Sequence, residues 1–214
     1  MSIATPRMTH LPIEQRGITL ADFLVPIRIG ERLGVRVRNI GLIVVGAMLI
    51  YLTARMAIPI PGSPVPVTGQ TFGVLLVSGA LGFRRGLLAV SLYVLIGAIG
   101  LPWFAEGKSG VSVILGATGG YLVGFIVAGA VVGRLAELGW DRGVLGAVGA
   151  MLIGNLVIYA VGVPWLIAVT GFDLATGVAK GLTPFLLGDA LKLALAAAAF
   201  PVAWWVVGRR PYED

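Results

Sequence analysis

Apolar residues dominate six stretches of the chain, and short stretches rich in Gly, Pro or Arg separate them. A helix needs about 20 mostly apolar residues to cross the hydrocarbon core of a bilayer. The stretches 70–81 and 87–101 are short, so a tilted or re-entrant arrangement of these two remains an alternative. The pattern predicts an all-α membrane protein with six transmembrane helices, at residues 41–60, 70–81, 87–101, 121–138, 144–169 and 184–207.

The composition agrees with a chain embedded in a lipid bilayer. Of its 214 residues, 57% are hydrophobic and only 12% are charged, and the mean hydropathy is +0.96. Soluble domains carry about 25% charged residues. These values exclude a disordered chain, and the absence of Cys excludes a disulfide-stapled secreted domain. The net charge of +6 does not indicate a nucleic-acid partner, because the basic residues lie mostly in the loops between apolar stretches.

The distribution of arginines predicts the orientation in the membrane. With six spans, both termini share one side, and that side holds twelve arginines against Lys108 and Lys180 on the other. Cytoplasmic loops carry an excess of basic residues. We therefore expect both termini in the cytoplasm, together with Arg7, Arg16, Arg28, Arg32, Arg36, Arg38, Arg84, Arg85, Arg134, Arg142, Arg209 and Arg210.

Three regions are expected along the chain: an N-terminal cytoplasmic or interfacial extension (1–38), the six-helix domain (39–210) and a cytoplasmic tail (211–214). Thr19 and Asp22 have the spacing of a helix-capping box ahead of an apolar triplet. This spacing favours a short interfacial helix that is interrupted at Pro26, although an unstructured tail is an equal alternative.

Glycines recur four residues apart along the fourth span and just before it, at Gly120 and Gly124 and again at Gly129 and Gly133. Small residues at this spacing let helix backbones approach closely in lipid. We interpret these glycines as helix-packing positions.

The chain lacks the residue clusters of an enzyme or a metal site. Its single histidine, His10, lies outside the spans, and no His and carboxylate cluster has metal-ligand spacing. The sequence Gly107-Lys108-Ser109 lacks the earlier Gly of a phosphate-binding loop, because residue 102 is Pro. We expect no enzymatic activity and no cofactor, so any ATP hydrolysis that supports transport requires another chain.

Apart from Arg134 and Glu137 at the cytoplasmic end of the fourth span, three charged residues lie inside the predicted spans: Arg55, Asp189 and Lys192. Such a charge costs at least about 2.5–3.5 kcal/mol on insertion scales and indicates a functional site. Asp189 and Lys192 are three residues apart and share one face of the last span. An ion pair with a structural role only is the alternative. Arg55 is expected near the outer end of the first span. Its side chain could reach the headgroups, face the pocket or pair with Asp189, and the headgroup contact is favoured.

Four uncharged polar residues lie at a depth similar to that of the charged pair: Asn155, Tyr159, Tyr93 and Gln70. Each has a structural alternative, as a bond to a neighbouring helix or as a helix cap. Their common depth favours one pocket in the outer half of the membrane.

The two long outer loops contain Pro, Gly and aromatic residues, at 61–68 and 101–120. Long loops in compact folds often serve as lids. Trp103, Phe104 and Trp165 are either interfacial belt residues or walls of the pocket, and for Trp165 the belt is favoured.

Six motifs in unbroken order resemble the BioY family and cover about residues 41–208, whereas residues 1–38 have no counterpart. BioY proteins are the biotin-binding S components of energy-coupling factor (ECF) transporters. The motifs are PVPVTGQTF (64–72), GFRRG (82–86), GAIGLP (97–102), GATGGY (116–121), Gly154-Asn155 with Tyr159, and GDALK (188–192).

The resemblance implies a six-helix S-component fold that captures biotin from outside. It also implies a multi-pass protein of a prokaryotic plasma membrane that works with a membrane T component and two cytoplasmic ATPase subunits. In that family the Asp and Lys of the last motif belong to the binding site. We expect the substrate-binding residues to be Asp189, Lys192, Asn155, Tyr159, Tyr93, Gln70, Thr68, Trp103, Gly119 and Tyr121.

Biotin has an apolar ring and chain, a ureido head with two N–H donors and one carbonyl, and a carboxylate. Lys192 is expected to bind the carboxylate, while Asp189 and Asn155 accept the ureido N–H groups and Asn155 or Tyr93 donates to its carbonyl. Three alternatives remain open: an S component for another small vitamin, a carrier that acts without ATPase partners, and a membrane enzyme that uses the charged pair as acid and base.

Overall fold

The structure is a computed structural model in which residues 19–24 and 32–208 are described. Most of this part is helical, and two short strands pair antiparallel with Ala57 opposite Thr68. The elements are α1 (Leu20–Leu24), α2 (Arg32–Ala54), β1 (Ala57–Ile58), β2 (Val67–Thr68), α3 (Gln70–Ala98), η2 (Ala105–Gly107), α4 (Val111–Leu115), α5 (Gly119–Glu137), η3 (Trp140–Arg142), α6 (Val144–Thr170), α7 (Leu174–Gly181), η4 (Thr183–Phe185) and α8 (Leu186–Gly208), where η marks a 3-10 turn.

Within the described ranges, five helical stretches are long and apolar enough to cross a membrane. They are Gly34–Ala54, Gln70–Ala98, Gly119–Glu137, Val144–Thr170 and Leu174–Val206.

The third helix, α3, folds back on itself at Gly82. This residue has φ 79° and ψ −176°, a backbone region that is essentially restricted to Gly. A hydrogen bond joins the Gln70 side chain to the Tyr93 hydroxyl, yet these residues would lie roughly 35 Å apart in a continuous helix. The two halves of α3 are therefore antiparallel neighbours. This arrangement is consistent with the two short predicted spans and with six spans in all.

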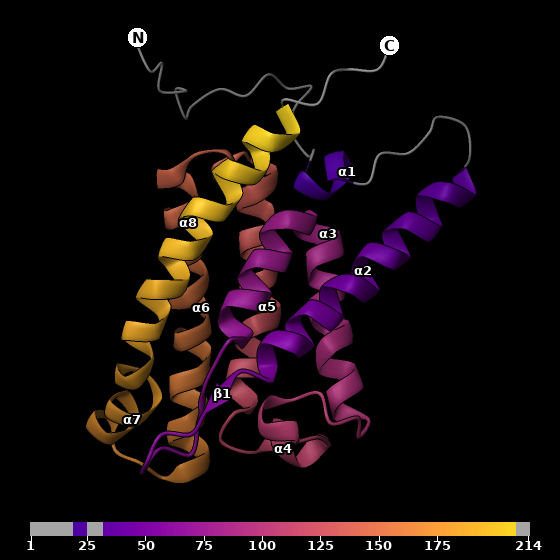
Figure 1. Ribbon diagram of the computed structural model, residues 1–214. Helices are drawn as coiled ribbons and strands as arrows, with labels where there is room; N and C mark the ends of the chain where they lie inside the picture. Colours follow the sequence, from indigo (N-terminus) through magenta and orange to yellow (C-terminus); the bar gives the residue numbers. More distant parts are fainter. Residues whose placement is uncertain (1–18, 25–31, 209–214) are drawn as a thin grey trace, which may run out of the picture.

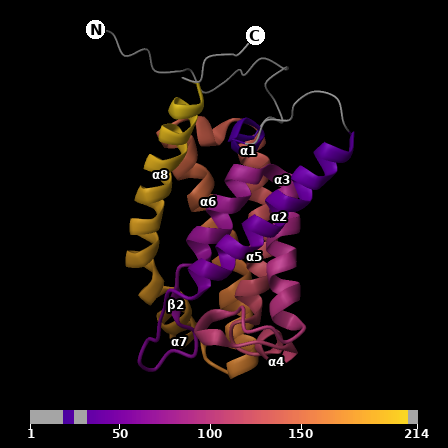
Figure 2. The same ribbon diagram turned by 45° about the vertical axis from the view of Figure 1, so that its right-hand side comes forward.

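The helices form a bundle with two distinct ends (Figure 1). One end carries α1, the turn of α3 and the last part of α8, and the opposite end carries the strands, α4 and α7. We call them the α1 end and the α7 end. Packing is most extensive between α3 and α5, between α5 and α6, and between α2 and α3. Figure 2 shows α8 at one edge of the bundle, and α8 packs mainly on α6.

The glycines of α5 lie where the helix meets its neighbours. A Cβ at Gly124 would lie 3.0 Å from the Ile158 carbonyl oxygen of α6, and one at Gly129 would lie 2.9 Å from the Ser78 hydroxyl of α3. A Cβ at Gly133 would lie 2.7 Å from the backbone of Gly82. The structure thus agrees with the packing role expected for the regularly spaced glycines.

A polar contact holds α8 at the α1 end. The Trp204 indole N–H donates to Oδ2 of Asp141 at 2.7 Å, and the Arg142 guanidinium lies 4.6 Å from the centre of the Trp204 ring. Asp141 is only 3% exposed. The turn η3 therefore anchors the last helix to the connection between α5 and α6.

The first spanning helix begins and ends earlier than the predicted stretch 41–60. It starts at Arg32 and ends at Ala54, so Arg55 follows the helix instead of lying within it. The Arg55 side chain is exposed at the α7 end, as expected for a headgroup contact. Of the expected N-terminal extension, the structure describes α1 and the start of α2. His10, Pro26 and the tail 211–214 lie outside the described residues.

Candidate binding site

Four polar side chains from α3, α6 and α8 meet in the interior near the α7 end. Lys192 donates to Oδ1 of Asp189 at 2.9 Å and to the Thr71 hydroxyl at 2.8 Å. The Tyr159 hydroxyl donates to Oδ2 of Asp189, and Thr71 contacts Oδ1 of the same carboxylate at 3.4 Å. We call Thr71, Tyr159, Asp189 and Lys192 the polar quartet.

Asp189 is buried and the other three members of the quartet are half-buried, with side-chain exposures of 8% for Asp189 and 16% for Lys192. The two charges form the ion pair that the sequence analysis kept as an alternative. An ammonium group carries three N–H donors, and two of those of Lys192 bind the quartet itself. The third donor remains for a ligand, so the ion pair does not exclude a binding role.

A pocket of about 620 Å³, including the part open to solvent, lies beside the quartet at the α7 end. Its wall is mostly apolar with a few polar groups, which is typical of small-molecule sites. Three members of the quartet face it. The lining residues are Val65, Pro66, Thr68, Gln70, Thr71, Phe104, Ala105, Glu106, Lys108, Val113, Thr118, Tyr121, Leu122, Phe125, Tyr159, Phe185 and Lys192.

The start of α3 places two predicted residues on the pocket wall. The Thr68 hydroxyl donates to Oε1 of Gln70 at 3.0 Å and accepts from the Gln70 backbone N–H at 3.2 Å. The Gln70 amide in turn donates to the Tyr93 hydroxyl. Tyr93 is fully buried and does not line the pocket. Tyr93 therefore fixes the orientation of Gln70 from behind.

Tyr121 lines the pocket and ties α5 to α7 through a 2.7 Å hydrogen bond from its hydroxyl to the Gly181 carbonyl. Gly119 does not line the pocket. It lies against the Ile114 backbone, and a Cβ there would also lie 3.1 Å from the Trp165 indole nitrogen. Gly119 thus permits close packing at the start of α5.

Trp103 also lies away from the pocket lining. Its ring stacks on Tyr51 of α2, with ring centres 5.0 Å apart, and lies 6.4 Å from the Tyr93 ring. Phe104 lines the pocket instead and is 2% exposed. Its ring rests against Gly97, where a Cβ would overlap it. Of the two loop aromatics, only Phe104 is a pocket wall.

Asn155 lies in a second, smaller cavity of about 190 Å³. Lys192 and Thr71 line both cavities, so they form the boundary between them. The Asn155 Oδ1 atom is buried and has no hydrogen-bond partner among the described residues. An acceptor in this state is available to an N–H donor of a ligand.

Glu106 and Lys108 form the solvent-facing polar part of the pocket wall. Their side chains are 32% and 58% exposed, and the Lys108 ammonium lies 2.6 Å from the Glu106 carboxylate. Exposed ion pairs contribute little to stability. Lys108 can therefore exchange Glu106 for a ligand carboxylate at small cost.

Sequence reasoning missed several residues of the pocket. Thr71 directly follows Gln70 in a quoted motif, and its place on the helix start was a signal that could have identified it. Phe125 and Phe185 read as ordinary core residues, and only the packing of α5 against η4 shows that they face a cavity. Glu106 and Lys108 were in a loop whose conformation has no periodic signal.

The fold and the pocket define a polytopic helical membrane protein with a mostly apolar pocket of small-molecule size near one end of its bundle. The family model described as "BioY family" matches residues 26–209, and the chain belongs to this family. The resemblance found in the sequence motifs is thereby confirmed.

Relatives and a solved structure support the assignment. The biotin transporter BioY of Thermotoga maritima is 43% identical over 156 residues, which cover 73% of this chain and 90% of that protein. BioY2 of Lactococcus lactis subsp. cremoris, also named a biotin transporter, is 35% identical over 158 residues, covering 73% of this chain and 85% of that protein. These relatives are transporters, in agreement with the expectation that the chain is not an enzyme.

A crystal structure of the S-component for biotin from an ECF-type ABC transporter is similar in fold. The TM-score is 0.75 at 24% identity, over 86% of this chain and 98% of that one. The predicted all-α S-component fold is confirmed by this match.

Proposed function

We propose that this chain binds biotin in the pocket at the α7 end and carries it across the membrane as an S component. The observation that carries the proposal is the polar quartet, of which Thr71, Tyr159 and Lys192 line an apolar pocket and hold Asp189 directly behind them. Membership of the BioY family and the relatives named as biotin transporters support biotin as the ligand.

The geometry of the quartet favours the ureido head, and not the carboxylate, at Lys192. A ligand carboxylate at Lys192 would lie next to Asp189, because the two side chains are 2.9 Å apart, and like charges this close repel. A ureido group presents N–H donors beside a carbonyl acceptor. It therefore complements a neighbouring carboxylate and ammonium, with Asn155 Oδ1 as a further acceptor. This orientation reverses the role that we expected for Lys192 from the sequence.

The carboxylate then lies toward Lys108. Of the described pocket-lining residues, Lys192 and Lys108 are the two with a cationic side chain, and Lys108 is on the solvent side. The apolar ring and chain would contact Phe104, Phe125 and Phe185 between the two polar ends.

The ten predicted residues divide into two groups under this proposal. Seven of them contact the ligand: Asp189, Lys192, Tyr159, Asn155, Gln70, Thr68 and Tyr121. The other three support the pocket without contacting the ligand. Tyr93 binds the lining residue Gln70, Trp103 packs near Tyr93, and Gly119 permits close packing at the start of α5, the helix of Tyr121.

Charge asymmetry supports capture from outside the cell. Among the described residues, Arg36, Arg38, Arg84, Arg85, Arg134 and Arg142 lie near the α1 end, where Figure 1 shows the start of α2, the turn of α3 and the link from α5 to α6. The positive-inside rule then puts the α1 end in the cytoplasm of a prokaryotic cell, with both termini, and the pocket in the outer half of the plasma membrane.

Release to the cytoplasm requires a source of energy outside this chain. The description of the structural neighbour, as part of an ECF-type ABC transporter, supports a membrane T component and two ATPase subunits as partners. The sequence offers no phosphate-binding loop of its own, since Gly107-Lys108-Ser109 lacks the required earlier Gly.

Calorimetric titration of the purified, biotin-free chain with biotin tests the proposal, with thiamine and riboflavin as controls. Saturable heat with biotin alone is the expected result. Binding of thiamine or riboflavin in place of biotin would leave the S-component fold intact but refute the ligand.

A further inference from the structure

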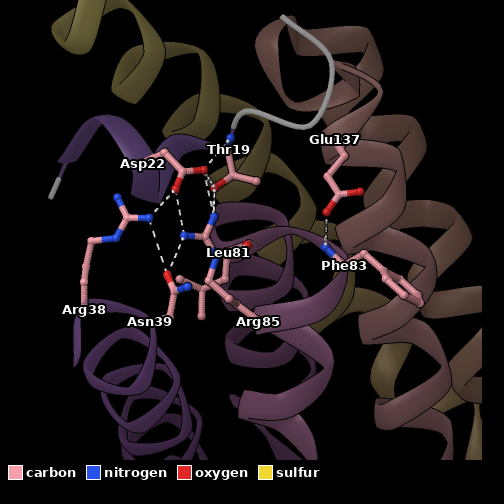
Figure 3. Close-up of polar contacts among 8 residues, drawn as sticks. All are labelled: Thr19, Asp22, Arg38, Asn39, Leu81, Phe83, Arg85 and Glu137. Atoms are coloured by element: carbon pink, nitrogen blue, oxygen red, sulfur yellow. Dashed lines mark hydrogen bonds and ion pairs between the residues drawn. The ribbon is translucent and has the colours of Figure 1, made fainter. Parts of the chain in front are cut away.

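The short helix α1 covers the turn of α3 at the end of the bundle opposite the pocket (Figure 3). Thr19, Leu20 and Ala21 are 1%, 6% and 3% exposed. A Cβ at Gly82 would lie 2.6 Å from the Thr19 methyl group, so Thr19 occupies the space that the missing side chain leaves. The helix is therefore docked on the bundle and not merely adjacent to it.

One carboxylate, that of Asp22, joins three separate elements. It accepts hydrogen bonds from the Thr19 backbone N–H and hydroxyl within its own capping box, at 3.1 and 2.9 Å. Arg85 of α3 binds both of its oxygens, at 2.7 and 2.8 Å, and Arg38 of α2 binds Oδ1 at 3.2 Å. Figure 3 shows the carboxylate between these side chains.

Arg85, the main partner of the Asp22 carboxylate, is itself held in place by other hydrogen bonds. The Arg85 Nε donates to the Leu81 carbonyl at 3.0 Å, and its Nη2 also donates to the Thr19 hydroxyl at 2.7 Å. A two-pronged guanidinium–carboxylate contact is among the strongest polar interactions in proteins. Partial burial acts to raise the pKa of Asp22, but the hydrogen bonds and charge of Arg85 outweigh it and hold this pKa below the usual 3.8. The carboxylate stays charged throughout the physiological range.

The helix that this contact reaches, α2, packs extensively on α3 but on little else among the described elements. Only 22% of its most apolar stretch is buried. One side of α2 is exposed and apolar, as at Val37 and Ile40 with 63% and 62% exposure. The BioY family match begins at residue 26, so α1 lies outside the part of the chain that the family defines.

We propose that α1 is a clasp that holds the α1 end of α2 against the turn of α3 through Asp22. The clasp fixes the angle between α2 and the rest of the bundle. It thereby also fixes the direction in which the exposed apolar face of α2 points in the membrane. Without the clasp, contacts between α2 and the first half of α3 remain, and the α1 end of α2 moves away from the bundle.

Spin-label distances in the full-length chain test the clasp. The chain has no Cys, so V37C on α2 and L138C at the end of α5 introduce the two labels at exposed positions. We expect one narrow distance distribution in this background. Asp22→Asn should widen the distribution about twofold or more, because the charge-assisted contacts of the carboxylate are lost. Asp22→Glu keeps the charge and should restore most of the narrow component.

Asp173→Asn is the matched control. Asp173 also caps a helix, accepting from the Thr176 N–H at 2.7 Å, but it belongs to α7 at the opposite end. It should leave the distribution unchanged. An unchanged distribution in Asp22→Asn, or equal widening in Asp22→Asn and Asp173→Asn, would overturn the proposal. A thermal melt of each variant shows that the labelled protein is folded. If Asp22→Asn is not, Arg38→Gln carries the test with the same widening expected, because it removes the contact of α2 with Asp22 and leaves Arg85 in place.

Discussion

The Lys192 ammonium lies 2.9 Å from the Asp189 carboxylate, one turn away on the same face of α8. The pair is electrically neutral as a unit, yet it offers a strong donor and a strong acceptor side by side. A neutral ligand group with adjacent N–H and carbonyl functions gains bonds to both without adding net charge to the interior. A carboxylate would gain one bond and face a like charge.

We therefore expect Asp189→Asn and Lys192→Met each to weaken biotin binding by about 10- to 100-fold, the range for loss of a charge-assisted hydrogen bond. Because the ureido head meets both residues, Lys192→Met should weaken biotin and biotin amide equally. Calorimetric titration of both ligands measures this, and Lys180→Met is the control, since Lys180 lies over Phe172 away from the pocket lining. A loss confined to biotin would instead place the carboxylate at Lys192.

Lys108 should discriminate between biotin and its amide. In Lys108→Met, biotin binding should fall by about 2- to 5-fold, as for an exposed charge contact, while the amide should bind as before. Glu106→Gln removes the carboxylate that competes for Lys108 at 2.6 Å, so it should tighten biotin binding and leave the amide unaffected. The two substitutions should thus change the affinity for biotin in opposite directions. Equal effects on biotin and its amide would show that the carboxylate does not meet Lys108.

Much of the fold follows from local pattern. Apolar stretches predicted the spanning helices, and the spacing of Asp189 and Lys192 on a helix predicted their common face. The similar depths of Gln70 and Tyr159 predicted that both would lie near this pair, and both line the pocket. These inferences needed only helix geometry and the thickness of a bilayer.

The remaining features depend on tertiary packing that a pattern does not encode. Tyr93 has the depth of a pocket residue, but its hydroxyl is used by Gln70. Trp103 and Phe104 are adjacent in the loop, and the space beside Gly97 determines which one faces the pocket. The joining of two short spans at Gly82 required the positive φ of that residue, which the sequence alone only permits.

Gly82 should be far more sensitive to substitution than a glycine in an open helical position. Gly82→Ala forces a side chain into a backbone conformation that costs about 1–3 kcal/mol, and the new Cβ would lie 2.6 Å from the Thr19 methyl group. We expect a clear fall in the melting temperature in detergent. Gly41→Ala is the control, because nothing lies within 4 Å of a Cβ there. A similar melting temperature for both variants would contradict the special role of the turn.

The contact between Asp141 of η3 and Trp204 in the last turns of α8, the anchor of α8, should make the stability of the protein depend on pH. Burial raises the pKa of Asp141 from 3.8 to about 6, although the hydrogen bond from Trp204 acts in the opposite direction. A raised pKa means that the folded state favours the protonated acid, so this residue stabilises the fold most below about pH 4 and loses that contribution as the pH rises through about 6. At neutral pH the chain keeps a buried carboxylate whose Oδ1 has no described partner.

Asp141→Asn removes the charge and retains an oxygen that can accept from Trp204. We expect this variant to melt at a higher temperature than the parent at pH 7.5, by a smaller margin at pH 5 and at nearly the same temperature near pH 4, as followed by thermal unfolding in one detergent. A difference that is constant from pH 5 to pH 7.5 would mean that titration of Asp141 does not limit the stability of the anchor.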